Sequence, residues 1–276
     1  MVYEKIYLKD TFPFLGEDGK NPYLELYLPY NMVEMNRNNQ KRPCMVVCPG
    51  GGYGMCSQRE SEPIALRFLS GGYNVFVLTY SVAPNRFPTQ LCEVAAAMEL
   101  IYKNADNWNC DTEKIAIMGF SAGGHLAAHY STMYDCTEVR KIFPDSKAVN
   151  ASVLCYPVIS ANPQISHKGS FNNLIGHYPE TEAEMNYFSC ECNVSQNTPP
   201  AFIWHTAEDA GVPVENSLVY ATALSKYKIP FELHIYPFGA HGLSTCDSET
   251  NDNLSKEVSR CSRWIEDAKE WLSIIL

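Results

Sequence analysis

One stretch of the chain decides the fold. It reads Lys114-Ile115-Ala116-Ile117-Met118-Gly119-Phe120-Ser121-Ala122-Gly123-Gly124-His125-Leu126-Ala127. The apolar run Lys114–Met118 predicts a buried strand, and Ala122–Met133 predicts a helix. Between them, Gly119–Gly123 matches the pattern Gly-x-Ser-x-Gly. Such a strand-to-helix turn holds its serine in a strained backbone conformation, and the flanking glycines leave room for the neighbouring chain. We therefore predict that the Ser121 hydroxyl stands above a sheet, at the positive end of a helix.

Apolar runs and segments with helical spacing alternate on both sides of this turn. The predicted strands are Tyr23–Leu28, Cys44–Cys48, Tyr73–Tyr80, Lys114–Met118, Ala151–Tyr156, Ala201–Thr206 and Phe231–Tyr236. The predicted helices are Glu62–Leu69, Thr89–Tyr102, Ala122–Met133, Pro213–Tyr227 and Leu254–Leu272. Continuous apolar strands between helices indicate an α/β fold with a mostly parallel sheet covered on both faces. In such a fold the ligand site lies outside the carboxyl ends of the strands.

One segment breaks the alternation. Ser160–Pro200 has little periodicity and is rich in Asn, Ser, His and aromatic residues. Because it falls between two predicted strands, we interpret it as a short cap inserted over the site. Asn31–Arg42 is polar and predicts an exposed loop. Residues 1–276 are then expected to form one domain, since the motifs near both ends must meet at a single site.

A serine nucleophile needs a base, which is usually a histidine oriented by a carboxylate. His241 follows the last predicted strand and is flanked by small residues, so its ring can reach over the sheet edge. Asp209 follows the preceding strand, and its position before Val212-Pro213 favours it over the neighbouring Glu208. The order serine, acid, histidine is the one that this fold requires.

The other histidines have simpler interpretations. His205 and His234 lie inside predicted strands and are expected to be structural. His125 and His129 are four residues apart on one helix face, but the glutamate of a His-Glu-x-x-His zinc motif is missing, so a packing role is favoured. His167 and His177 fall in the cap, where they either contact substrate or lie in solvent. No metal site is predicted.

A serine that attacks a carbonyl group forms a tetrahedral intermediate, and the oxygen of that intermediate needs backbone donors. Gly50-Gly51-Gly52 follows the strand Cys44–Cys48 and is free to bend its amides inward. The amide of Ala122, directly after the serine, is the natural second donor. Tyr53 follows the glycines and is predicted to wall the substrate pocket.

Composition restricts the partners and the compartment. The net charge is −10, so nucleic acid is an unfavourable partner. The N-terminus lacks the apolar core of a signal peptide, and no apolar run is long enough to span a bilayer, which predicts a cytoplasmic protein without a membrane anchor. The 11 cysteines are odd in number and lack a Cys-x-x-Cys motif. We expect mostly buried, reduced side chains.

These motifs together resemble the α/β-hydrolase superfamily, and more narrowly its acetyl-esterase branch, near the acetyl xylan esterase-like and hormone-sensitive-lipase-like enzymes. Besides the serine turn, the resemblance is carried by Pro49-Gly50-Gly51-Gly52-Tyr53, Tyr80-Ser81-Val82-Ala83-Pro84, Pro199-Pro200-Ala201-Phe202-Ile203-Trp204-His205-Thr206-Ala207 and Gly239-Ala240-His241-Gly242-Leu243. It extends from about Pro43 to Leu272. The chain departs from the lipase-like relatives at Pro49, where they have a histidine.

The resemblance implies a function and a set of site residues. Ser121, Asp209 and His241 would form the catalytic triad, and the amides of Gly51, Gly52 and Ala122 would form the oxyanion hole. The implied activity is hydrolysis of short-chain esters, with an acetylated sugar as the suggested substrate and no cofactor. A prolyl-oligopeptidase-type serine peptidase and a non-catalytic binding protein of the same fold are the alternatives. A homodimer is one candidate assembly, because the sequence does not specify the oligomeric state.

Overall fold

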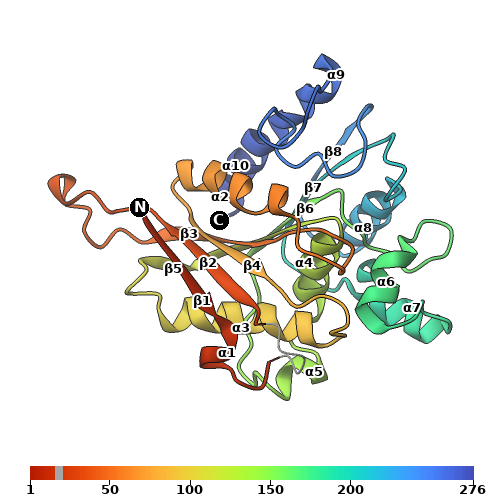
Figure 1. The fold of residues 1–276 in the computed structure, drawn as a ribbon, viewed down its shortest axis with the longest axis horizontal. Helices are drawn as coiled ribbons and strands as arrows, with labels where there is room; N and C mark the ends of the chain where they lie inside the picture. Colours follow the sequence, from red (N-terminus) through yellow and green to blue (C-terminus); the bar gives the residue numbers. More distant parts are fainter. Residues whose placement is uncertain (16–20) are drawn as a thin grey trace.

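An eight-stranded sheet forms the centre of the computed structural model, which describes residues 1–15 and 21–276 (Figure 1). Its strands are β1 (Val2–Tyr7), β2 (Tyr23–Leu28), β3 (Arg42–Cys48), β4 (Asn74–Thr79), β5 (Cys110–Phe120), β6 (Ala151–Cys155), β7 (Ala201–Thr206) and β8 (Phe231–Tyr236). Their order in space is β1-β2-β4-β3-β5-β6-β7-β8. The pairs β1–β2 and β2–β4 are antiparallel, and every pair from β4–β3 to β7–β8 is parallel. The predicted mostly parallel sheet is confirmed.

Helices cover both faces of the sheet. The α-helices are α1 (Leu8–Thr11), α2 (Glu62–Ser70), α3 (Thr89–Lys103), α4 (Ala122–Met133), α5 (Thr137–Arg140), α6 (Lys168–Ile175), α7 (Glu182–Phe188), α8 (Glu215–Lys226), α9 (Lys256–Ser259) and α10 (Trp264–Ile275). The 3-10 turns are η1 (Val33–Met35), η2 (Gln58–Glu60), η3 (Cys190–Asn193) and η4 (Arg260–Arg263). Helices α2 and α10 pack on one face, and α3, α4 and α8 pack on the other (Figure 1).

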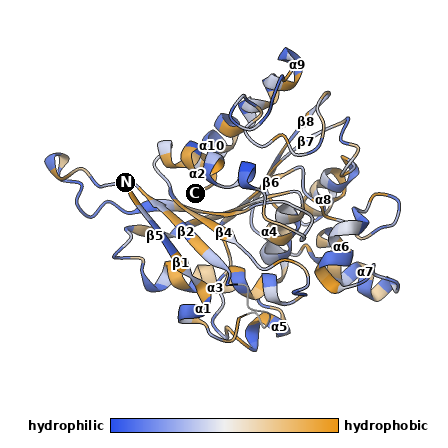
Figure 2. Ribbon diagram, in the orientation of Figure 1, coloured by the Kyte–Doolittle hydropathy of each residue, from blue (hydrophilic) through white to orange (hydrophobic). Residues whose placement is uncertain are grey.

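The central strands are apolar along their whole length because both of their faces are buried. In β3, Cys44 and Val46 belong to the core beneath α3 and α4, whereas Met45 and Val47 belong to the core beneath α2 and α10. Burying each large apolar side chain contributes roughly 1.5–3 kcal/mol. The covering helix α10 carries both hydrophobic and hydrophilic residues, as a helix at the surface does (Figure 2).

Three features differ from the sequence-based expectations. Strand β1 was not predicted, because most of its residues are exposed and it carries no buried apolar stripe. The cap segment, expected to lack periodicity, contains α6 and α7 and the turn η3. The C-terminal helix was predicted from Leu254, but helical structure begins at Lys256 and runs through η4 to Ile275.

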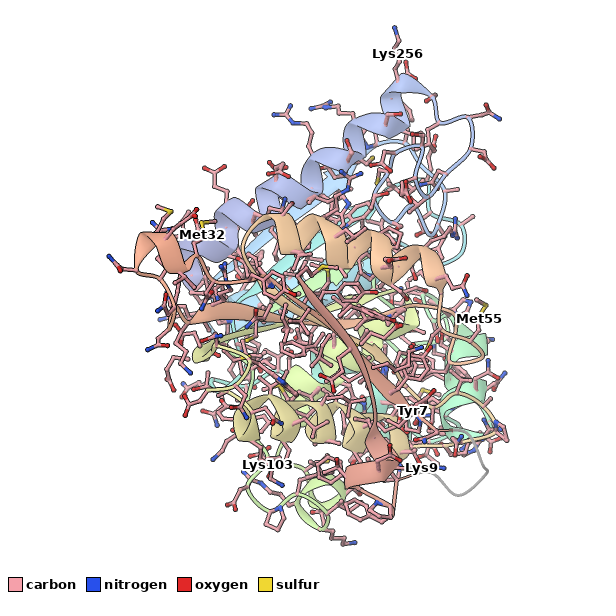
Figure 3. All side chains as sticks on the ribbon, turned by 60° about the vertical axis from the view of Figure 1, so that its left-hand side comes forward. Tyr7, Lys9, Met32, Met55, Lys103 and Lys256 are labelled. Atoms are coloured by element: carbon pink, nitrogen blue, oxygen red, sulfur yellow. The ribbon has the colours of Figure 1, made fainter. Side chains whose placement is uncertain are left out.

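The surface loops and the cysteines agree with the expectations. The polar loop before β3 is exposed, and Met32 projects from its tip (Figure 3). All 11 cysteines are free, and most of them are buried in the core, with only Cys192 classed as exposed. They therefore pack as small apolar side chains. Among the residues that the structure describes, no helix is both long enough and apolar enough to cross a membrane.

Helix α4 buries two histidines beneath the cap. His125 lies 2.9 Å from the Tyr53 hydroxyl through Nδ1 and 2.8 Å from the Phe188 carbonyl oxygen through Nε2. The ring of His129 stacks on Phe87, and its buried Nε2 has no hydrogen-bond partner in the described part of the chain. Burial lowers the pKa of His125 to about 4 and the pKa of His129 well below its ordinary value. Both rings are neutral packing elements, as predicted.

These two histidines make the fold sensitive to acid. The unfolded chain takes up a proton at each ring below a pH of about 6.5, whereas the folded chain resists it, so stability falls as the pH drops. Between pH 6.5 and 5 each ring is expected to remove about 1.5 kcal/mol from the free energy of unfolding. Measured by urea denaturation, the free energy of unfolding of His129→Phe should fall by about 1.5 kcal/mol less than that of the wild type between pH 6.5 and 5. Equal losses in the two proteins would contradict the prediction.

Candidate active site

Ser121 occupies the turn between β5 and α4. Its backbone has φ 52° and ψ −118°, a conformation that residues other than glycine rarely adopt. The turn is compact because its glycines lack side chains. A Cβ atom at Gly123 would lie 2.1 Å from the Cys48 carbonyl oxygen, and one at Gly119 would lie 2.1 Å from the Gly123 carbonyl oxygen. The turn therefore requires glycine at both positions of the Gly-x-Ser-x-Gly pattern, because a side chain at either one would clash with the backbone.

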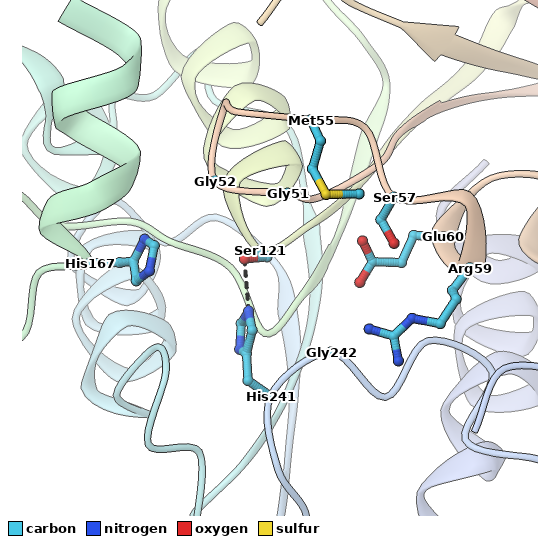
Figure 4. Close-up of a pocket in the computed structure, with 10 residues that line it drawn as sticks. All are labelled: Gly51, Gly52, Met55, Ser57, Arg59, Glu60, Ser121, His167, His241 and Gly242. Carbon is cyan, nitrogen blue, oxygen red and sulfur yellow. Dashed lines mark hydrogen bonds between the residues drawn. The ribbon is translucent and has the colours of Figure 1, made fainter. Parts of the chain in front are cut away.

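Three side chains predicted from the sequence meet above this turn. Nε2 of His241 lies 2.7 Å from the Ser121 hydroxyl oxygen (Figure 4). Nδ1 of His241 lies 2.6 Å from Oδ2 of Asp209. Because the carboxylate can only accept, the ring proton of neutral His241 belongs on Nδ1, and Nε2 is left to accept the serine proton. The loops after β7 and β8 deliver the acid and the histidine.

Asp209 is held by four donors. Its Oδ1 accepts hydrogen bonds from the amides of Gly211 and Val212, at 2.9 and 2.8 Å. Its Oδ2 accepts from His241 and also from Nε2 of buried His205, at 3.2 Å. Burial alone would raise the pKa of Asp209, but hydrogen bonds from His205 and His241 outweigh it and leave the pKa well below its usual range. Asp209 therefore stays ionised.

The competing carboxylate lies elsewhere. Glu208 accepts a hydrogen bond from the amide of Gly239 at 3.2 Å, and among the described residues no hydrogen bond or ion pair joins it to His241. His205, which was expected to be only structural, supports Asp209 directly. Its Nδ1 lies 2.8 Å from the Ser217 hydroxyl and its Nε2 lies 2.9 Å from the Val212 carbonyl oxygen, so the proton on Nε2 points toward acceptors. Nothing in the sequence distinguishes this histidine from a simple packing residue.

A buried carboxylate connects the loops around the site. Glu60 accepts hydrogen bonds from the Gly50 amide at 2.8 Å and from the Tyr156 hydroxyl at 2.6 Å. The same hydroxyl accepts from the amide of Ser244, in the loop that carries His241. The Tyr156 ring also packs edge-on against the His241 ring, with centroids 5.1 Å apart. Burial raises the pKa of Glu60, and the bonds from Tyr156 and Gly50 oppose that rise. Glu60 and Tyr156 were not identified from the sequence.

A cavity of about 410 Å³ opens beside the Ser121 hydroxyl (Figure 4). It is lined by Gly51, Gly52, Met55, Ser57, Arg59, Glu60, Ser121, His167, His241 and Gly242. The amides of Gly51, Gly52 and Ala122 donate to no acceptor among the described residues. Gly51 and Gly52 have φ 125° and 63°, values that favour glycine. His167 enters the site from the cap, which was one of the two interpretations open for it.

Tyr53 does not lie where the sequence suggested. The prediction placed it in the pocket wall, but it is absent from the lining of the cavity and its side chain is buried. Its positive φ of 57° belongs to the turn after the glycines. The ring packs against Tyr80 and His125, with centroids 5.9 Å from each. Tyr53 thus anchors the glycine turn to α4.

Within the described residues, no group of three or more His, Cys, Asp or Glu side chains could hold a metal ion. The arrangement instead offers a hydroxyl, a base, a carboxylate and free amides at the carboxyl edge of a mostly parallel sheet. A fold and a Gly-x-Ser-x-Gly turn of this kind define an α/β hydrolase. Residues 24–224 match the family model described as BD-FAE. The chain belongs to the BD-FAE family within the α/β-hydrolase superfamily.

Individual relatives agree with this assignment. The chain is 39% identical over 256 residues to endo-1,4-beta-xylanase B of Butyrivibrio fibrisolvens, covering 89% of this chain and 38% of the relative. It is 33% identical over 232 residues to an acetylxylan esterase of Xylanibacter ruminicola, covering 83% and 45%. The chain thus spans less than half the length of these curated relatives.

A solved structure gives a match over the whole chain. The acetyl ester-xyloside bifunctional hydrolase of Caldicellulosiruptor lactoaceticus superposes with a TM-score of 0.84 and 35% identity, covering 99% of this chain and 96% of that one. The enzyme class expected from the sequence, a hydrolase of the acetyl-esterase branch, is supported by these relatives.

Proposed function

We propose that the protein is a serine carboxylesterase that hydrolyses short-chain esters, above all acetyl esters. The observation that carries this proposal is the continuous hydrogen-bonded chain from Ser121 through His241 to Asp209, with distances of 2.7 and 2.6 Å. Such a chain is the arrangement that activates a serine hydroxyl for attack on a carbonyl carbon.

The proposed reaction proceeds in two steps. His241 takes the Ser121 proton through Nε2 as the serine oxygen attacks the ester carbonyl. Collapse of the tetrahedral intermediate breaks the ester bond, and the histidine returns the proton to the departing alcohol. Water then attacks the acyl-enzyme with the same base and releases the acid and the free serine. Asp209 stays ionised throughout and stabilises the imidazolium ion.

The amides of Gly51, Gly52 and Ala122 are the proposed oxyanion donors. Gly51 and Gly52 line the cavity, and the Ala122 amide is one of the unpaired donors at the start of α4. Removing one such donor from a hydrolase costs about 10²–10³ in kcat. The remaining N-terminal turn of α4 adds positive potential at the same place.

We further propose an acetylated sugar as the alcohol part of the substrate. Two relatives are described as an acetylxylan esterase and an acetyl ester-xyloside hydrolase. The cavity is small, about 410 Å³, which suits a short acyl chain next to one sugar unit. The curated relatives are much longer than this chain, so their other activities are not proposed for it.

A fluorophosphonate probe tests this function directly. Incubated with the folded wild-type protein, the probe should add one phosphonyl group, located on Ser121 by peptide mass spectrometry. Ser121→Ala should take up no label and should release acetate from 4-nitrophenyl acetate at least about 10⁴ times more slowly. Absence of label on wild-type Ser121 would refute the serine mechanism. Turnover of a prolyl amide in preference to the acetyl ester would instead favour the peptidase alternative.

A further inference from the structure

The polar groups that line the cavity differ in whether they already have hydrogen-bond partners within the protein. Glu60 is the only carboxylate among the described residues that line it. Its two oxygens are turned toward the Gly50 amide and the Tyr156 hydroxyl, which hold them at 2.8 and 2.6 Å. The cavity therefore has no carboxylate free to accept hydrogen bonds from a ligand. The polar groups of the cavity that remain available to a ligand are hydrogen-bond donors.

Arg59 supplies the strongest of these donors. Its carbonyl oxygen accepts a hydrogen bond of 2.5 Å from the Ser244 hydroxyl, which fixes the backbone of η2 against the His241 loop. Its side chain is exposed and extends along the cavity beside Gly242, opposite the serine (Figure 4). The guanidinium has no hydrogen-bond or ion-pair partner in the part of the chain that the structure describes. All of its N–H donors are thus available to a ligand.

His167 supplies a second donor from the opposite wall. Its Nδ1 accepts a hydrogen bond from the Ser170 amide at 3.3 Å and lies 2.8 Å from the Ser170 hydroxyl. Because Nδ1 is an acceptor, the proton of the neutral ring belongs on Nε2. Burial and the nearby His241 lower the pKa of His167, which keeps the ring neutral. His167 thus offers an uncharged N–H on the cap side of Ser121.

We propose that Arg59 forms a carboxylate-binding subsite, so that the preferred substrate is an acetylated sugar that also carries a negative charge, as a uronic acid does. This inference rests on the proposed esterase function. A guanidinium binds a carboxylate through two parallel hydrogen bonds, a geometry that a neutral hydroxyl cannot match. The chain as a whole carries a charge of −10, so an anionic substrate needs a local cation to enter. His167 is then placed to donate to an uncharged oxygen of the same sugar.

A pair of matched substrates tests the subsite. The first is an O-acetylated methyl glucuronoside, and the second is the O-acetylated methyl glucoside, which has a hydroxymethyl group in place of the carboxylate. Acetate release gives kcat/KM for each, and the measured quantity is their ratio. For the wild type at low salt we expect the ratio to favour the glucuronoside by about tenfold or more, the effect of a charge-assisted hydrogen bond. The preference should weaken at high salt.

Substitutions at Arg59 identify the group responsible. Arg59→Met should bring the ratio close to one, and Arg59→Lys should keep part of the preference because it retains the charge without the bidentate geometry. Arg37→Met, which removes the same charge from the exposed loop before β3, is the matched control and should leave the ratio unchanged. A ratio of one or less in the wild type, or a preference that survives Arg59→Met, would overturn the inference.

This result is separable from the test of the esterase function. Turnover of the neutral glucoside, lost in Ser121→Ala, supports the esterase whatever the ratio is. If the wild type hydrolyses both sugars equally, the esterase stands and the carboxylate subsite falls. If it hydrolyses neither sugar and Ser121 takes no label, both proposals fail together.

Discussion

Asp209→Asn is expected to lower kcat by about 10⁴ while leaving the fold intact, the size of effect known for the equivalent change in other serine triads. The four donors around the carboxylate explain why. The amides of Gly211 and Val212 both point at Oδ1, so the asparagine must keep its oxygen there. Its NH₂ group then faces His241 and His205, and donates to Nδ1 of His241. The ring proton moves to Nε2, which can no longer accept the serine proton.

The neighbouring carboxylate provides the control. Glu208→Gln removes a charge one residue away, at an exposed side chain that accepts a hydrogen bond from the Gly239 amide. It should keep kcat within about threefold of the wild type, since surface substitutions away from the site have small effects. Steady-state kinetics on 4-nitrophenyl acetate compares the three proteins, and circular dichroism checks that each is folded. A folded Asp209→Asn protein within tenfold of wild-type kcat would exclude Asp209 as the orienting acid.

Gly123→Ala should produce a large loss of stability for the addition of a single methyl group. The added Cβ would meet two backbone carbonyl oxygens at the end of β3, those of Cys48 at 2.1 Å and Pro49 at 2.3 Å. Backbone atoms cannot rotate away as a side chain can, so α4 must move off the sheet. Overpacking of a core costs typically 1–3 kcal/mol, and we expect at least about 3 kcal/mol here, measured by urea denaturation.

The same substitution should also reduce activity. Gly50–Gly52 follows Pro49 directly, so a shift of the β3 end displaces the proposed oxyanion donors, and kcat should fall by about 10² or more. Gly169→Ala is the matched control, because its Cβ would meet only the His167 side chain, at 3.4 Å. That change should alter the free energy of unfolding by less than about 1 kcal/mol. A Gly123→Ala protein as stable as this control would contradict the steric argument.

Features with a local cause could be predicted from the sequence. The turn around Ser121 depends on small residues within a few positions, and the strands β2, β7 and β8 coincide with the predicted runs. The positions of His241 and Asp209 near Ser121 could be predicted because α/β hydrolases carry a histidine and an acidic residue after particular strands of the sheet. Their mutual contact follows from the parallel order of β5, β7 and β8 in one sheet.

Features that depend on long-range packing could not be predicted. Glu60 lies in a polar stretch that is typical of a solvated turn, and only the folded chain shows that its carboxylate is buried against Gly50 and Tyr156. Tyr53 was assigned to the pocket by its position after the glycines, but the backbone turns its ring toward α4 instead. Strand β1 pairs with β2 through its backbone and through side-chain pairs such as exposed Tyr3 against Tyr27, which leaves no buried apolar pattern in β1 to detect.

The segment from Gly50 to Glu62 unites duties that enzymes often distribute over several loops. It carries two of the proposed oxyanion donors, forms one wall of the cavity through Met55 and Ser57, and holds Glu60 in the core. An insertion or deletion anywhere in it would disturb all three at once. Replacing the outward side chains alone would leave the backbone course unchanged. Point substitutions in this segment could therefore change the substrate preference, whereas changes in its length would disrupt the site.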